Sequence, residues 1–161
     1  ASCLPGRQES SKLKDFEPVG DLIVKTSILR GTVVKREEIP SLIDELPILM
    51  VAACCARGKT VFKGVGELRL KETDRIRSMS DNLRKMGACI EVVKTGRVEK
   101  VIIQGVKGLK GASVASYADH RTAMSMVIAA LRAQGATRID NIACINKSFP
   151  NFLSLLKTLL N

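Results

Sequence analysis

The sequence predicts an α/β domain in which short strands alternate with helices that are largely buried. Short runs of β-branched and apolar residues are each followed by a helical pattern of apolar residues. This order of elements occurs twice, in residues 22–93 and in residues 101–160, with an offset of about 77 residues. The chain has 161 residues, 45% of them hydrophobic, so we treat residues 1–161 as a single domain with its own core.

The elements of the first half follow local strand, turn and helix signals. Residues 1–17 are polar and mixed, and they favour a strand remnant and a loop that begin as if cut from a longer chain. Short apolar runs predict strands over residues 22–25, 29–34 and 60–63. Residues 46–56 form an Ala-rich helix that is apolar on nearly all sides, which is typical of a buried helix.

The second half continues with a helix, a hairpin and the second copy of the repeat. Apolar residues at three- and four-residue steps predict a helix over residues 73–86. Residues 89–93 and 100–103 are expected to be strands joined by a turn around Gly96. The repeat then predicts, in order, a strand over 109–114, a helix over 119–131, a strand over 135–139 and a last helix ending at 160.

The composition of the chain disfavours several classes of protein: membrane proteins, nucleic-acid-binding proteins and proteins with disulfide or zinc frameworks. No apolar run reaches the roughly 18 residues of a membrane helix. The net charge of +10 implies an affinity for anions, but the basic residues are dispersed, and only 3% of the chain is aromatic, which disfavours nucleic acid. The cysteines match no zinc or disulfide spacing, so we expect reduced thiols and a cytoplasmic protein. They are Cys3, Cys54, Cys55, Cys89 and Cys144.

Charged residues gather just before each helix, in residues 41–45, 71–75, 117–121 and 146–148. Each group lies at an expected strand-to-helix junction, where free backbone N–H groups and the helix dipole favour anions. If the repeats are related by rotation, the junctions converge at one end of the domain. Four cations could then surround a phosphate and a carboxylate: Lys71, Arg75, Arg121 and Lys147.

Simpler interpretations remain open for each residue taken singly. Arg75 could form an exposed ion pair with the acidic residue three positions before it. Asp44 and Asp119 could be ordinary helix N-caps, and His120 could be a packed histidine. Lys147 alone would be a surface lysine. The repetition of charged groups at equivalent positions favours a functional interpretation.

These motifs resemble those of the 5-enolpyruvylshikimate-3-phosphate synthase family. The resemblance rests on residues 43–47, 71–75, 83–87, 119–124 and 147–150, in the order of the family. It implies an enzyme of two domains, each built from three βαβαββ units around buried helices as an inside-out α/β barrel. This chain resembles most of the C-terminal half, so we expect an excised, incomplete domain that is inactive without its N-terminal partner domain.

The resemblance also implies a reaction and a role for each candidate residue. The family transfers the enolpyruvyl group of phosphoenolpyruvate to the 5-hydroxyl of shikimate 3-phosphate and releases phosphate, within chorismate biosynthesis. Asp44 would bind substrate and take the hydroxyl proton, and Glu72 would move the proton at C3 of phosphoenolpyruvate. Lys71 would bond the shikimate ring oxygens. The remaining cations, Arg75, Arg121 and Lys147, would bind phosphoenolpyruvate or the inhibitor glyphosate.

The resemblance further implies a monomer with no cofactor or metal, and with neither nucleic acid nor a membrane as partner. Glu67 departs from the family, many members of which have Asn there beside the shikimate phosphate; a carboxylate is unfavourable next to a phosphate, so we leave Glu67 out of the site. Two alternatives remain: a UDP-N-acetylglucosamine enolpyruvyl transferase domain, or a non-catalytic basic module that binds anions or nucleic acid.

Overall fold

A mixed four-stranded sheet forms one outer layer of the computed structural model, which describes residues 19–96 and 98–160. The strands lie in the order β1–β2–β4–β3, where β1 pairs with β2 in parallel and the other neighbours are antiparallel. β3 and β4 form the expected hairpin, with Gly96 at its turn. The strands are β1 (Val33–Val34), β2 (Lys59–Lys63), β3 (Cys89–Thr95) and β4 (Val98–Gln104).

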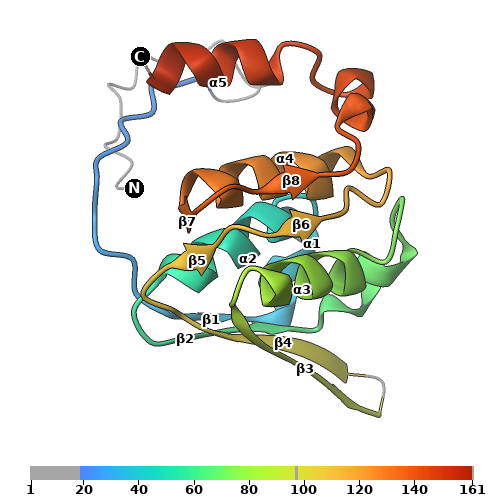
Figure 1. Cartoon of the computed structure of the whole chain (residues 1–161). Coiled ribbons are helices and arrows are strands. Elements are labelled where there is room, and N and C mark those ends of the chain that lie inside the picture. The colour runs from blue at the N-terminus through green and yellow to red at the C-terminus, as the bar shows by residue number, and fades with distance from the viewer. Residues whose placement is uncertain (1–18, 97, 161) are drawn as a thin grey trace, which may run out of the picture.

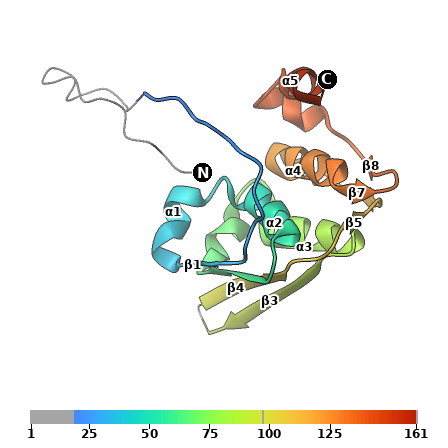
Figure 2. The ribbon, with the colours of Figure 1, turned by 90° about the vertical axis from the view of Figure 1, so that its left-hand side faces the viewer.

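Three helices pack together above this sheet. α2 (Leu46–Cys55) and α3 (Arg75–Lys85) lie between the sheet and α4 (His120–Leu131), as Figures 1 and 2 show. Met79 of α3 and Met126 of α4 are fully buried in one core cluster shared by the helices and the sheet. The helices thus form the centre of the structure and the strands its outside, as the sequence predicts.

Short elements connect and extend these layers. α4 is flanked by two small parallel pairs, in which β5 (Leu109–Lys110) pairs with β7 (Ala133–Gln134) and β6 (Ser113–Val114) with β8 (Arg138–Ile139). The chain ends in α5 (Phe152–Leu160), whose leucines are largely exposed. The remaining helical turns are η1 (Arg36–Glu38), α1 (Ile39–Leu42), η2 (Val65–Leu70) and η3 (Ala143–Lys147).

Two glycines allow equivalent close approaches between backbone segments. A Cβ on Gly31 would lie 2.3 Å from the carbonyl oxygen of Lys59, and one on Gly111 would lie 2.2 Å from that of Ala136. Each glycine also donates its N–H across the strand pair, as Gly31 does to the Arg57 carbonyl at 2.8 Å. Because any side chain would force the segments apart, only glycine fits at either position.

The predicted strand over residues 22–25 is wrong. This segment is irregular and runs along the outside of the molecule (Figure 1), and its apolar side chains are exposed. Within the described residues no strand pairs with this segment. Its β-branched residues favour an extended strand only where a neighbouring strand is present, so they do not form one here. The strand expected over 29–34 is reduced to an isolated bridge between Arg30 and Arg57 followed by β1. The expectations for residues 1–17 lie outside the described residues.

The helix predictions are confirmed with shifted ends. α3 begins at Arg75 rather than at Thr73 because the Asp74 side chain caps it, accepting the Arg77 N–H at 2.9 Å. The strands expected over 109–114 and 135–139 each break into two-residue pieces. The four described cysteines are free thiols, and no helix in residues 19–96 or 98–160 is long and apolar enough to cross a membrane.

Candidate functional site

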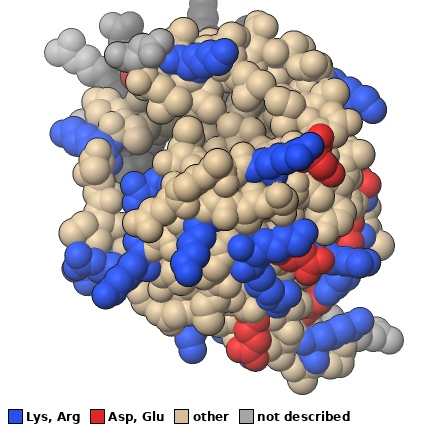
Figure 3. Space-filling model, viewed as in Figure 1, with Lys and Arg blue, Asp and Glu red and all other residues tan. Residues whose placement is uncertain are grey.

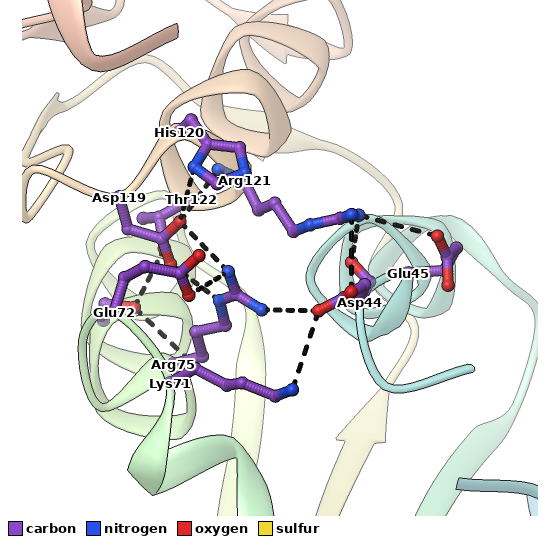
Figure 4. A network of polar contacts seen from close by, with 10 residues as sticks. Asp44, Glu45, Lys71, Glu72, Arg75, Asp119, His120, Arg121 and Thr122 are labelled. Carbon is purple, nitrogen blue, oxygen red and sulfur yellow. Dashed lines mark hydrogen bonds and ion pairs between the residues drawn. The ribbon is translucent and has the colours of Figure 1, made fainter. Parts of the chain in front are cut away.

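Three helix starts meet beside one another at the candidate site. The turn before α2 carries Asp44, the turn before α3 carries Lys71 and Glu72, and the first turn of α4 carries Arg121 (Figure 4). The chain enters α4 through a tight turn in which Tyr117 and Ala118 have φ values of 54° and 56°. Positive φ is costly for residues with a side chain, so the surrounding structure must hold this turn in place.

Arg75 lies at the centre of the site and is buried, with a side chain only 1% exposed. Its Nε donates to Asp119 Oδ2 at 2.8 Å, one terminal nitrogen to Asp44 Oδ1 at 3.0 Å, and the other to Glu72 Oε2 at 2.6 Å. Burial tends to lower the pKa of Arg75, but Asp119 and the other carboxylates outweigh it and raise that pKa. The guanidinium therefore binds together residues from all three helix starts.

Asp119 is the fully buried partner of Arg75, with 0% of its side chain exposed. It caps α4 by accepting the Arg121 N–H at 2.9 Å and also accepts the Thr122 hydroxyl at 3.3 Å. The His120 imidazole lies beside it, with Nδ1 3.8 Å from Oδ1. A buried carboxylate needs such partners, because an unpaired charge in the core is strongly unfavourable.

Asp44 faces the solvent and three cations at once, with 43% of its side chain exposed. Its carboxylate lies 3.5 Å from Arg121 Nη2 and 4.0 Å from Lys71 Nζ, and Arg121 also donates to its backbone carbonyl at 2.8 Å. Burial tends to raise the pKa of Asp44, but the hydrogen bond from Arg75 and the charges of Arg121 and Lys71 hold it below the ordinary value. Asp44 is therefore ionised at neutral pH and accessible from outside.

The structure brings five of the six candidate residues into this network. They are Asp44, Lys71, Glu72, Arg75 and Arg121. The sixth, Lys147, lies at the end of η3 with an exposed side chain. Within the described part of the chain, no hydrogen bond or ion pair joins Lys147 to the network, although η3 itself packs against α4.

Several simpler interpretations of single residues are decided by the geometry. Asp119 is indeed a helix N-cap, whereas Asp44 is not, because the N-cap of α2 is Glu45 and no side chain caps there. Arg75 does pair with Glu72, but the guanidinium is buried rather than exposed. The junctions before α2 and α3 follow the helical turns α1 and η2 rather than strands.

Sequence reasoning missed two contributors to the network. Asp119 was expected at most to cap α4, yet it also carries the main bond to Arg75. Glu45 accepts from Arg121 Nη1 at 3.5 Å and was not singled out. The charged junctions at residues 41–45 and 117–121 contain both carboxylates, but nothing in the sequence indicates that the Arg75 guanidinium is buried and therefore needs Asp119 as a partner.

Chemically, the site combines exposed carboxylates with flanking cations. Asp44 and Glu72, 43% and 51% exposed, approach Arg75 from different sides and are accessible for proton transfer. The side chains of Lys71 and Arg121, 28% and 32% exposed, lie beside them and can bind an anion. No group of three potential metal ligands occurs among the described residues. The arrangement fits acid–base chemistry on an anionic substrate.

Comparison with known proteins assigns the chain to a family. A family model described as EPSP synthase (3-phosphoshikimate 1-carboxyvinyltransferase) matches residues 14–156. The chain belongs to the EPSP synthase family. The 3-phosphoshikimate 1-carboxyvinyltransferase of Geotalea uraniireducens is 48% identical over 141 residues, which are 88% of this chain and 32% of the relative. That of Desulforamulus reducens is 47% identical over 150 residues, 93% of this chain and 34% of the relative.

Solved structures agree on the fold. The EPSP synthase of Acinetobacter baumannii superposes with a TM-score of 0.73 at 39% identity, covering 81% of this chain and 30% of that protein. The α/β fold with central helices is thus that of EPSP synthases, present here as part of a domain. The chain spans about a third of the length of the curated relatives that it matches.

Proposed function

We propose that this chain is part of an enzyme that transfers the enolpyruvyl group of phosphoenolpyruvate to the 5-hydroxyl of shikimate 3-phosphate and releases phosphate. The observation that carries the proposal is the network around Arg75, in which two accessible carboxylates and two accessible cations converge from three helix starts. Family membership supports the same reaction, because the curated relatives are named 3-phosphoshikimate 1-carboxyvinyltransferases.

Asp44 and Glu72 divide the proton transfers in this proposal. Asp44 takes the proton of the 5-hydroxyl. Its lowered pKa keeps it ionised but makes it a weak base, so it accepts the proton once the substrate has drawn the flanking cations away from it. Glu72 delivers a proton to C3 of phosphoenolpyruvate and later removes one, so that the tetrahedral intermediate can lose phosphate. Both carboxylates are anchored by the same guanidinium, which holds them in a defined relative position.

The cations bind the two anionic substrates. Lys71 bonds the shikimate ring oxygens, while Arg121 and Arg75 bind phosphoenolpyruvate and stabilise the departing phosphate. In the substrate-free structure these cations are neutralised by protein carboxylates. An anionic substrate must therefore displace Asp44 or Glu72 from a cation, and that displacement leaves the carboxylate free for proton transfer. Lys147, at the end of η3 and next to α4, also binds phosphoenolpyruvate in this proposal.

The chain acts as most of one domain of a two-domain enzyme. Its own residues hold the acid–base groups, and the missing N-terminal domain completes the binding site for both substrates. The isolated chain is accordingly inactive. The complete enzyme works as a monomer without cofactor.

Reassembly tests the proposal. This chain replaces the matching third of the Geotalea enzyme, and phosphate release is measured with phosphoenolpyruvate and either shikimate 3-phosphate or UDP-N-acetylglucosamine. We expect turnover only with shikimate 3-phosphate. A well-folded chimera that releases no phosphate, or one that prefers the nucleotide sugar, would contradict the proposal. A salt-sensitive gel shift with DNA at physiological ionic strength would favour the basic-module alternative instead.

The dispersed charge supports the small-molecule assignment. Figure 3 shows Lys and Arg side chains spread over the visible face, interspersed with acidic groups on one side rather than gathered into a single stripe. A nucleic-acid interface instead concentrates its basic residues on one surface. The accessible cations that carry the proposal lie within the network itself.

A further inference from the structure

A second charged cluster lies behind the site, at the base of the segment that carries Lys71 and Glu72. Glu99 of β4 is buried, with 5% of its side chain exposed, and it forms an ion pair with Arg69 of η2. Arg69 Nε lies 2.9 Å from one carboxylate oxygen of Glu99 and 3.1 Å from the other. A terminal nitrogen of the same guanidinium donates to Asp74, the N-cap of α3. Arg69 thus joins β4 to the start of α3.

The position of Glu99 is unusual for a charge. Along β4 the buried residues alternate with partly buried ones, and Glu99 occupies the same face as Val101 and Ile103, which is the face packed against the helices. An apolar residue is expected at such a position. A buried carboxylate there is costly unless it is paired and hydrogen-bonded, so its presence calls for a specific partner. Arg69 supplies that partner through its planar fork.

The bonds of Arg69 hold both ends of one short segment. Residues 70–73 lie between Arg69 and Asp74 and contain Lys71 and Glu72. The segment has little apolar packing of its own, because Leu70 is 84% exposed and the residues after it form bends rather than helix. The position of the segment therefore depends on polar contacts. These are the contacts of Arg69 at its base and, at the site itself, the ion pairs of Lys71 with Asp44 and of Glu72 with Arg75.

We propose that Arg69 and Glu99 act as positioning residues that clamp the segment of residues 70–73 and thereby place Lys71 and Glu72 for the reaction. This inference rests on the proposed function. Asp74 has two tasks in the clamp, because one carboxylate oxygen caps α3 through the Arg77 N–H and the other accepts from Arg69. Arg69 therefore couples the start of α3, and with it Arg75, to the rigid β3–β4 hairpin.

Neither clamp residue touches the candidate site directly. The partners of Arg69 are Glu99 and Asp74, and neither belongs to the network around Arg75. The contribution to catalysis is therefore geometric, and a misplacement of about 1 Å can cost about 100-fold in rate. A purely structural role would lower stability without changing the turnover of the folded enzyme.

The test uses Arg69→Lys, which keeps the charge but loses the fork, and Glu99→Gln, which keeps the shape but loses the charge. The matched control is Arg77→Lys, because Arg77 lies on α3 with its side chain 74% exposed and, among residues 19–96 and 98–160, forms an ion pair with Asp81 alone. All three variants are made in the chimeric full-length enzyme for kinetics. They are also made in this chain, where backbone ¹⁵N order parameters are measured at residues 70–73.

We expect Arg69→Lys and Glu99→Gln to lower kcat about 10- to 100-fold. The order parameters at Lys71 and Glu72 should fall from about 0.85 to below about 0.6. Arg77→Lys should leave both quantities at the values of the unsubstituted protein. This combination separates lost positioning from lost stability, because unfolded protein would reduce the active fraction without making the segment mobile in the folded molecules.

Two results would overturn the clamp: unchanged order parameters in both variants, or a mobile segment with the kcat of the Arg77→Lys control. An unsubstituted chimera that folds but releases no phosphate would contradict the proposed function instead. In that case the order parameters still decide whether Arg69 and Glu99 hold the segment. If Arg69→Lys fails to fold, the isosteric Glu99→Gln variant provides the same comparison.

Discussion

The guanidinium of Arg75 and the carboxylate of Asp119, 44 residues apart in the chain, form a buried pair in which Nε lies 2.8 Å from Oδ2. Both side chains are essentially excluded from solvent, at 1% and 0% exposure. The pair joins the starts of α3 and α4, and its second nitrogen, Nη2, lies 3.4 Å from Oδ1. The integrity of the site therefore depends on Asp119, whose carboxylate lies behind Arg75 and has no exposed surface of its own for a substrate to contact.

Breaking this pair should destabilise the fold. Asp119→Asn replaces the buried carboxylate partner of Arg75 with a neutral amide and leaves only the more exposed Asp44 and Glu72 to balance the guanidinium, so we expect a loss of about 3 kcal/mol in the free energy of unfolding. Urea denaturation of the chain measures it. Asp81→Asn, which removes an exposed carboxylate paired with Arg77, is the control and should cost no more than about 1 kcal/mol. Equal losses in the free energy of unfolding for the two variants would show that the buried pair contributes no more to stability than an exposed ion pair does.

Removing the acid–base carboxylate next to Arg75 should lower turnover strongly. Glu72→Gln keeps the size of the side chain but cannot exchange the proton at C3, so we expect kcat of the chimeric enzyme to fall about 100- to 10,000-fold with a modest change in KM. Steady-state phosphate release provides the measurement. Glu67→Gln, at an exposed position five residues earlier on η2, should retain the full rate.

The accessible arginine should act on binding more than on chemistry. Arg121→Ala removes a cation that is 32% exposed, and we expect the KM for phosphoenolpyruvate to rise at least 10-fold while the KM for shikimate 3-phosphate changes little. Arg132→Ala, at the exposed far end of the same helix, is the matched control. If Arg121→Ala lowered kcat strongly and left both KM values intact, the roles of Glu72 and Arg121 would have to be exchanged.

The pH dependence of the free energy of unfolding should reveal how much the ionised Glu99 carboxylate contributes to stability. The hydrogen bond from Arg69 outweighs burial and holds the pKa of Glu99 below its ordinary value of 4.5. A lowered pKa in the folded state contributes stability that is fully present above pH 4.5 and is lost as the pH falls through the folded value. The free energy of unfolding of Glu99→Gln should therefore approach that of the unsubstituted chain between about pH 5 and pH 3.

The control for this pH series is Glu91→Gln, which changes an exposed glutamate on the neighbouring strand β3. Its difference from the unsubstituted chain should stay small across the range. A difference for Glu99→Gln that does not shrink toward low pH would mean that the lost stability comes from packing rather than from the charge of the carboxylate.

Local signals predicted the helices well because their causes lie within a few residues. The periodicity of Ile76, Met79 and Leu83 indicates α3, and all three residues are buried in the core. The failure at residues 22–25 has the opposite cause. A strand needs a partner elsewhere in the chain, and the β-branched residues of that segment cannot indicate that no partner lies beside it in the described structure.

The convergence of five candidate residues could be predicted from the sequence, but neither the burial of Arg75 nor the position of Lys147 outside the network could. Repetition of charged junctions indicated that Asp44, Arg75 and Arg121 converge, and they do. The burial of Arg75 was not predictable from spacing, because the carboxylates that compensate its buried charge lie 31 and 44 residues away in the chain. For the same reason Asp119 could be expected as a cap but not as the main partner of Arg75.

The long sequence separation of the Arg75 contacts has a consequence for how the protein folds. The β3–β4 hairpin brings together residues that are close in the chain, so it can form early. The charge of Arg75, in contrast, can be buried only after Asp44 and Asp119, which lie in two distant segments, have come close to it. We therefore expect Arg75 and Asp119 to have φ-values near zero, with their substitution accelerating unfolding and leaving the folding rate almost unchanged. The candidate site would then be the last part of the molecule to be assembled and the first to be lost.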